Sequence, residues 1–113
     1  MIDIKITKNN AGQTVGFVVK NHGDSHVCAA VSMLVINTVN SIESLTQKGT
    51  SGFKCDYNEN GGFIAFSLTD QLNRDAEAGL LLDALVLGLC SVRDQHPDEI
   101  SIKLAKVEGS DSP

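Results

Sequence analysis

Three side chains with reactive chemistry lie close together in residues 21–32, which read NHGDSHVCAAVS. Cys28 carries a thiol that becomes a strong nucleophile when it is ionised, and a neighbouring imidazole can accept its proton. Two imidazoles are available nearby, those of His22 and His26. The combination is typical of covalent catalysis by a cysteine and a histidine that work as a pair.

The element that must position Cys28 is a long helix predicted over residues 26–48, because apolar residues recur there three or four positions apart. Asp24 or Ser25 can cap its start, and with Ser25 as the cap, Cys28 is the third helical residue. Unpaired backbone amides and the positive end of the helix dipole favour an anion there. We therefore expect Cys28 to ionise readily, and we expect its amide and those of its neighbours to hold an oxyanion.

The two histidines differ in position. His22 ends a predicted strand and can turn back over the helix start, whereas His26 lies on the helix and points to another face. His22 is therefore the better candidate base. The side chains of His22, His26 and Cys28 also resemble a partial metal site, but structural zinc needs four ligands and no fourth candidate lies nearby. We expect no metal and no other cofactor.

The other two cysteines, Cys55 in a predicted strand and Cys90 in an apolar helix, have no histidine near them in the sequence. Free cysteine is among the most buried residue types, so both are predicted to be packing residues. The three cysteines lack C-x-x-C spacing, and the first ten residues lack the pattern of a secretory signal. This combination predicts free thiols and a cytoplasmic protein.

The remaining elements follow a simple order. Alternating apolar residues predict two hairpins, over residues 2–19 and 53–68. A second helix is predicted over residues 74–94, with Asn73 as its cap, and a last strand over residues 100–105. The order ββαββαβ predicts an α+β fold, a two-layer sandwich with two long helices packed on one mostly antiparallel sheet.

Length and charge exclude several classes of protein. The chain has 113 residues, which predicts a single domain over residues 1–107 followed by a flexible tail over residues 108–113. Its formal net charge is −5, and because phosphate contacts dominate nucleic-acid affinity, direct binding to DNA or RNA is not expected. The apolar run over residues 78–92 contains Asp83 and is shorter than the roughly 20 residues of a membrane span, so we expect none.

The run VCAAVSMLVINTVNSIESLT, residues 27–46, resembles the first helix of the ribosomal-processing cysteine proteases of Firmicutes and related bacteria. In that family a histidine ends the second strand and a cysteine opens the first helix, which is the order of His22 and Cys28 here. Residues 57–62, YNENGG, also resemble the second hairpin of the family. The similarity extends over nearly the whole chain.

This resemblance implies a hydrolase of ribosome biogenesis, a homodimeric thiol protease of the cytoplasm. Its partner would be a peptide substrate, the precursor of large-subunit ribosomal protein twenty-seven, from which it would remove an N-terminal extension beside aromatic residues. The resemblance makes Cys28 the nucleophile, His22 the base and then the acid, and Ser32 a supporting residue one helical turn further on. The broad apolar face of the first helix also favours a dimer.

Three features depart from the family pattern. Asn21-His22-Gly23 replaces the usual Gly-His-Ala, the step from His22 to Cys28 is only six positions, and Ser25 stands where the family usually has an acidic residue. Asp24, one position earlier, is a candidate to orient His22. The short loop leaves an alternative open, in which the chain is a non-catalytic dimeric module that binds a peptide or a ribosomal partner with the same fold.

Overall fold

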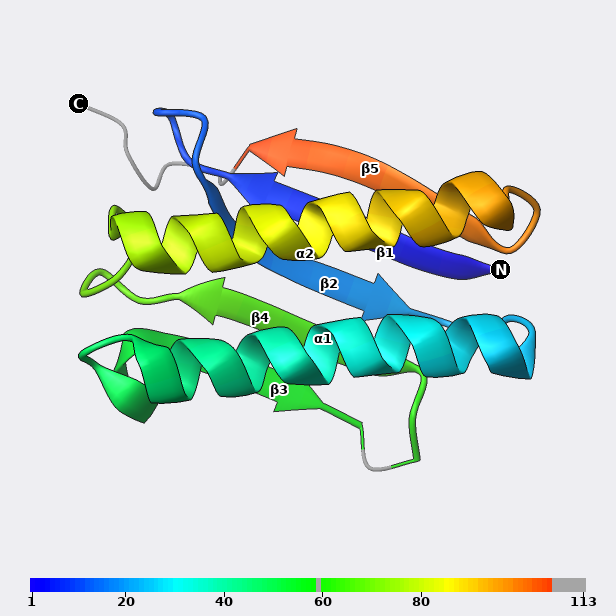
Figure 1. Ribbon diagram of the computed structural model, residues 1–113, viewed down its shortest axis with the longest axis horizontal. Helices are drawn as coiled ribbons and strands as arrows, with labels where there is room; N and C mark the ends of the chain where they lie inside the picture. The colour runs from blue at the N-terminus through cyan, green and yellow to red at the C-terminus, as the bar shows by residue number, and fades with distance from the viewer. Residues whose placement is uncertain (59, 107–113) are drawn as a thin grey trace.

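The computed structural model describes residues 1–58 and 60–106, and two long helices cover one face of a five-stranded sheet in it (Figure 1). The elements are, in chain order, β1 (Ile2–Lys8), β2 (Thr14–Lys20), α1 (Ser25–Leu45), the short 3-10 helix η1 (Gly49–Gly52), β3 (Phe53–Tyr57), β4 (Phe63–Leu68), α2 (Ala76–Gln95) and β5 (Ile100–Lys106). The predicted ββαββαβ order and α+β class are confirmed. The predicted tail over residues 108–113 and the predicted end of the domain at 107 lie outside the described residues.

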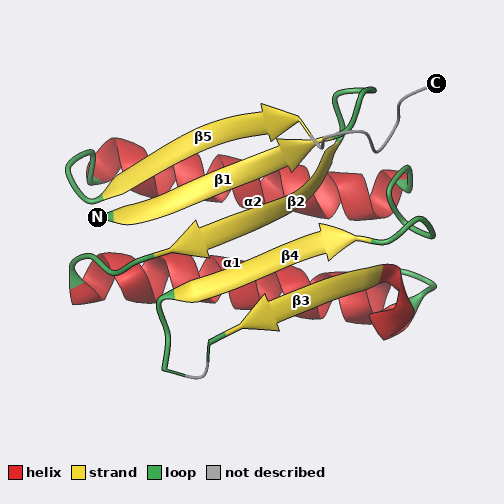
Figure 2. Ribbon diagram, turned by 180° about the vertical axis from the view of Figure 1, so that it is seen from behind, coloured by secondary structure: helices red, strands yellow, loops and turns green. Residues whose placement is uncertain are grey.

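The sheet has the strand order β3-β4-β2-β1-β5, which Figure 2 shows from the side that the helices leave uncovered. Neighbouring strands are antiparallel except β1 and β5, which are parallel. The parallel pair follows from α2, which carries the chain back across the sheet before β5 begins. The alternation predicted for the first strand is also present, because Ile2, Ile4 and Ile6 are buried while Asp3 and Lys5 are exposed.

Each helix buries one face against the sheet. Four apolar residues of α1 are at most 3% exposed: Val27, Val31, Val35 and Ile42. Those of α2 are Ala78, Leu82, Leu85 and Leu89. By length and composition alone α1 would also be long and apolar enough to cross a membrane. Core helices of globular proteins can meet the same two criteria. Here its most apolar face packs into the core cluster instead.

The two helices pack closely against each other at Gly88 of α2. A Cβ built on this glycine would lie 3.1 Å from the side chain of Leu34 of α1, so the absence of a side chain permits the close approach. Gly88 thus marks a point of close packing between the two helices.

The end of α1 differs from the predicted one. The helix stops at Leu45, three residues before the predicted end at residue 48, with Thr46 in an extended conformation as its C-cap. The hydroxyl of Thr46 donates a hydrogen bond to the carbonyl oxygen of Ile42, and so does its amide. Both bonds satisfy the Ile42 carbonyl oxygen in the last turn, and the extended backbone of Thr46 takes the chain out of the helix.

The start of α2 also differs, because its N-cap is Asp75 and not Asn73. The Asp75 carboxylate accepts a hydrogen bond of 2.8 Å from the Ala78 amide. Asn73 is held in the preceding turn, where its carbonyl oxygen accepts a hydrogen bond of 3.1 Å from the side chain of the buried Asn9. This contact spans 64 positions, so no local pattern could have indicated it.

Candidate active site

A cavity of about 580 Å³ lies between α1, from Cys28 to Val39, and the strands β2, β3 and β4. Its volume is within the usual range of ligand sites. Cys28 and Ser32 of α1 line it, together with His22 after β2 and Gly62 before β4. Apolar side chains supply much of the remaining lining: Ile2, Val19, Val31, Val35, Ile36, Val39, Phe63 and Ile64. The structure therefore brings three of the predicted site residues, Cys28, His22 and Ser32, to one apolar cavity.

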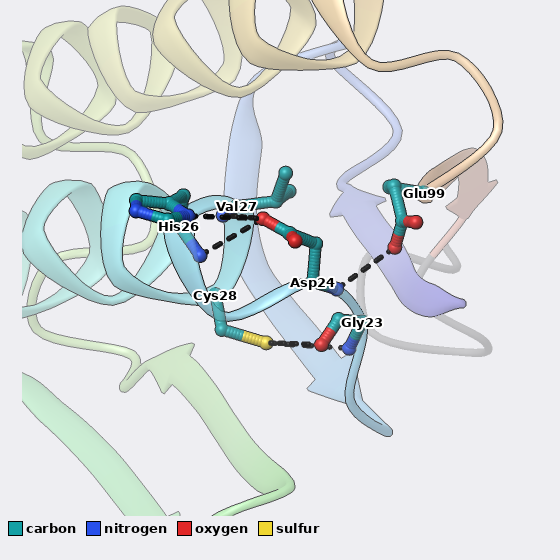
Figure 3. Close-up of polar contacts among 6 residues, drawn as sticks. All are labelled: Gly23, Asp24, His26, Val27, Cys28 and Glu99. Atoms are coloured by element: carbon teal, nitrogen blue, oxygen red, sulfur yellow. Dashed lines mark hydrogen bonds and ion pairs between the residues drawn. The ribbon is translucent and has the colours of Figure 1, made fainter.

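The sulfur of Cys28 contacts the backbone of Gly23, in the loop that leads into α1 (Figure 3). The Gly23 amide donates a hydrogen bond to Sγ at 3.3 Å, and the Gly23 carbonyl oxygen lies 3.6 Å from Sγ as a possible acceptor for the thiol proton. The side chain is half-buried and lines the cavity. One residue of backbone can thus stabilise both the thiolate, through its amide, and the neutral thiol, through its carbonyl.

Asp24, and not Ser25, caps α1. Its carboxylate accepts hydrogen bonds from the amides of His26 at 3.0 Å and Val27 at 3.4 Å, and its carbonyl oxygen accepts one from the Cys28 amide at 2.9 Å. Cys28 is therefore the fourth helical residue, one later than expected. The amides of Val27 and Cys28 have acceptors within the helix start, so this arrangement does not by itself support the prediction that they hold the oxyanion.

The side chain of His26 points away from the cavity, as predicted. It is 94% exposed, and its Nδ1 lies 3.6 Å from Oδ2 of Asp24. The Asp24 carboxylate thus binds the helix start and His26, and no hydrogen bond or ion pair joins it to His22, so the structure does not support the predicted orienting role. Within residues 1–58 and 60–106, no group of His, Cys, Asp or Glu is placed to hold a metal ion, which contradicts the three-ligand alternative.

His22 packs against the turn that joins β3 to β4. Gly61 and Gly62 there have φ of +83° and +82°, and a Cβ built on Gly62 would lie 2.7 Å from Nε2 of His22. Asn21, with φ of +71°, donates its amide hydrogen bond to the Gly62 carbonyl oxygen at 2.9 Å. This bond ties the residue before His22 to the same turn, and glycine at 62 leaves room for the imidazole.

Neither Asn21 nor Gly62 was predicted as a residue that supports His22. Asn21 offered a signal, because asparagine adopts the left-handed conformation more readily than most residues and directly precedes His22. The sequence around Gly62 indicated only a hairpin turn, because nothing local shows that an imidazole 40 positions earlier packs on it.

Cys55 of β3 also lines the cavity, although the sequence predicted only a packing role. It is half-buried and packs against the core cluster as well, so that both descriptions apply. Burial raises the pKa of the Cys55 thiol, and the negative charge of Asp56 raises this pKa further. Cys90 is half-buried but does not line the cavity. Cys28 is thus the cavity thiol that has both a helix start and a backbone donor beside it.

Comparison with known proteins finds relatives in two bacteria. Ribosomal processing cysteine protease Prp of Staphylococcus aureus is 27% identical over 108 residues, which cover 90% of this chain and 97% of the relative. Its namesake from Bacillus subtilis is 28% identical over 85 residues, which cover 72% of this chain and 71% of the relative.

Solved structures have the same fold. The crystal structure of the essential ribosomal processing protease Prp from S. aureus, in complex with a covalently linked product peptide, matches with a TM-score of 0.84 at 26% identity over 93% of this chain and 100% of that one. SMU.848 from Streptococcus mutans matches with a TM-score of 0.82, also at 26% identity, over 95% and 96% of the two chains. The family model for cysteine protease Prp matches residues 1–101, and the chain therefore belongs to the Prp family of cysteine proteases.

Proposed function

We propose that this chain is an endopeptidase that removes the N-terminal extension of large-subunit ribosomal protein twenty-seven, with Cys28 as the nucleophile and His22 as the base. The observation that carries the proposal is the shared cavity, which Cys28 and His22 line from two different elements. The apolar lining of this cavity suits a peptide segment with apolar or aromatic side chains.

The reaction begins when the His22 imidazole accepts the Cys28 proton and the thiolate attacks the carbonyl carbon of the scissile bond. A carbon–sulfur bond forms and the carbonyl oxygen becomes an oxyanion. The His22 imidazolium then donates its proton to the leaving nitrogen as the carbon–nitrogen bond breaks, which leaves a thioester on Cys28. A water molecule gives a proton to His22 and attacks this thioester, and the proton returns to the sulfur as the carbon–sulfur bond breaks.

The surrounding groups support these steps. The Gly23 amide donates to Sγ at 3.3 Å and so stabilises the thiolate that attacks the substrate. Ser32 lines the same cavity one turn along α1 from Cys28 and offers a hydroxyl to the substrate backbone. The covalently linked product peptide in the S. aureus relative supports a covalent mechanism.

The test is cleavage of a peptide that contains the N-terminal extension and the first mature residues of the host's own ribosomal protein, followed by mass spectrometry. Cys28→Ala and Cys28→Ser should abolish cleavage while the far-ultraviolet circular dichroism stays unchanged. Cys90→Ala is the matched control, because this half-buried thiol lies outside the cavity, and it should cleave at the wild-type rate. Cleavage by Cys28→Ala at the wild-type rate would exclude the proposal, and binding without cleavage by the wild type would favour the non-catalytic module.

We also propose that the protein acts as a homodimer in the cytoplasm. Large apolar side chains are exposed on both helices, with Met33 at 67%, Leu80 at 71% and Leu87 at 71%, and a second copy would cover such a surface. The free thiols of the described residues are consistent with a reducing compartment. Sedimentation at micromolar concentration should give twice the chain mass, and a single species of the chain mass would exclude the dimer.

A further inference from the structure

Glu99, in the turn between α2 and β5, contacts the loop that joins His22 to Cys28 (Figure 3). Its Oε2 accepts a hydrogen bond of 2.9 Å from the Asp24 amide, although the two residues are 75 positions apart. A Cβ built on Gly23 would lie 2.6 Å from the same oxygen. The carboxylate therefore binds the amide of one loop residue and occupies the space where a side chain of the other would begin.

This contact gives the amide of the cap residue a hydrogen-bond acceptor that α1 itself does not provide. In a capping box, a Glu or Gln at the third helical position accepts a hydrogen bond from the amide of the cap residue. In α1 that position is Val27, whose side chain has no acceptor. Glu99 takes over this function from a distant element, so the orientation of the Asp24 peptide depends on the turn before β5.

Glu99 is itself held by the sheet. Its carbonyl oxygen accepts a hydrogen bond of 2.8 Å from the Ile2 amide, and its amide donates one of 3.0 Å to the His96 carbonyl oxygen. The backbone of Glu99 is thereby fixed at the point where β1 and β5 begin their parallel pairing. A fixed backbone limits where the carboxylate can lie, so the contact constrains the loop and does not merely follow it.

We propose that Glu99 is a positioning residue for the reactive cysteine. By binding the Asp24 amide it fixes the Gly23–Asp24 peptide and, through it, the backbone of Gly23, whose own amide in the preceding peptide points at Sγ of Cys28. Two hydrogen bonds are joined through one residue of backbone: the Asp24 amide donates to Oε2 at 2.9 Å, and the Gly23 amide, in the peptide before it, donates to the sulfur at 3.3 Å. The proposal rests on the proposed function for its role in proteolysis, while its effect on the sulfur is measurable without any substrate.

The experiment measures the rate at which iodoacetamide alkylates each cysteine over a range of pH, by mass spectrometry of the intact folded chain. In Glu99→Ala the Gly23 amide loses its alignment, so Cys28 should react about fivefold more slowly at neutral pH, the effect of one hydrogen bond. Its pH profile should move to higher pH. Glu99→Gln should behave as the wild type, because its amide oxygen can still accept from Asp24.

The matched control is Asp98→Ala, which removes the exposed carboxylate next to Glu99 and should leave the Cys28 rate unchanged. Cys55 and Cys90 report on general loosening inside the same molecule. An unchanged Cys28 rate in Glu99→Ala would overturn the proposal, and so would equal changes at all three cysteines. If Glu99→Ala does not fold, Glu99→Asp replaces it, because the shorter side chain withdraws the carboxylate and should slow Cys28 as well.

Cleavage of the ribosomal peptide separates this proposal from the proposed function. A positioning role predicts that Glu99→Ala lowers kcat and leaves KM within about twofold, because the contact lies on the nucleophile side of the cavity. If the wild-type chain cleaves no peptide while Cys28 alkylation still depends on Glu99, the protease function fails and the positioning role stands.

The tight approach of Gly23 to Glu99 allows a second, independent test. Gly23→Ala places a methyl group 2.6 Å from Oε2 and should slow Cys28 alkylation in the wild-type background. In the Glu99→Ala background that neighbour is gone, so the same substitution should have a clearly smaller effect. Equal effects in the two backgrounds would overturn the proposal.

Discussion

Replacement of Gly62 by alanine tests whether the β3–β4 turn positions the proposed base. The new Cβ would lie 2.7 Å from Nε2 of His22, 3.3 Å from Cδ2 and 3.4 Å from Cε1. Ordinary contacts begin at 3.4 Å, so the imidazole must withdraw by about 0.7 Å or turn to another rotamer. Gly62 lies in the left-handed region, so alanine there also strains the backbone by about 1–2 kcal/mol.

The two effects appear in different measurements. A misplacement of about 1 Å in a catalytic group can cost about 100-fold in rate, so we expect kcat/KM of Gly62→Ala to fall by about 10- to 100-fold. The backbone strain should lower the free energy of unfolding by about 1–2 kcal/mol. Peptide cleavage followed by mass spectrometry gives the first quantity, and urea denaturation gives the second.

Gly61→Ala is the matched control, because its φ is also positive but its Cβ would lie 3.4 Å from the nearest atom of His22. Its free energy of unfolding should fall by about as much as that of Gly62→Ala. Its activity should stay within about threefold of the wild type, since the imidazole of His22 need not move. Equal losses of activity in the two variants would attribute the effect to the strained turn. Full activity in Gly62→Ala would refute the placement of His22 on this turn.

Two further predictions concern the thiol of β3 and the helix cap. Because burial and then Asp56 raise the pKa of Cys55, less of its thiolate is present at any given pH, so iodoacetamide should label it more slowly than Cys28 near neutral pH. Asp56→Asn removes one cause and should shift Cys55 labelling to lower pH, and an unchanged labelling profile would contradict that cause. Asp24→Ala removes the acceptor of two amides of α1 and should lower the free energy of unfolding by about 1 kcal/mol in urea denaturation. Asp24→Asn retains a capping oxygen and should lose little, since the ion pair with the exposed His26 is weak; equal losses in both variants would exclude the capping explanation.

Local patterns in the chain were sufficient for the elements and their buried faces. The alternation of Ile2, Ile4 and Ile6 indicated a half-buried strand, and the helical spacing of Val27, Val31 and other apolar residues indicated the buried face of α1. These periods arise from the backbone geometry of strands and helices, so a few neighbouring residues are enough to show them. His22 and Cys28 could be proposed as a pair from the sequence because their side chains have complementary chemistry and only six positions separate them.

Helix boundaries were less accurate because several residues compete to end or cap a helix. Asp24 and Ser25 were both suitable caps, and the carboxylate of Asp24 accepts from two amides. At α2 the choice depended on Asn9, which binds the carbonyl oxygen of Asn73 and keeps that residue in the preceding turn. A contact over 64 positions lies beyond the reach of any local rule.

The surroundings of the site emerged only when the chain was folded. Strand order places β4 beside β2, and this brings Gly62 against His22, while the crossover through α2 returns Glu99 to the Asp24 amide. These contacts join residues 40 and 75 positions apart, so they depend on how the whole sheet is assembled and no local pattern predicts them. The proposed pair, His22 and Cys28, could thus be predicted from neighbouring residues. The groups that contact it depend on long-range packing, because hydrogen bonds and steric contacts act over ångströms in space and not along the chain.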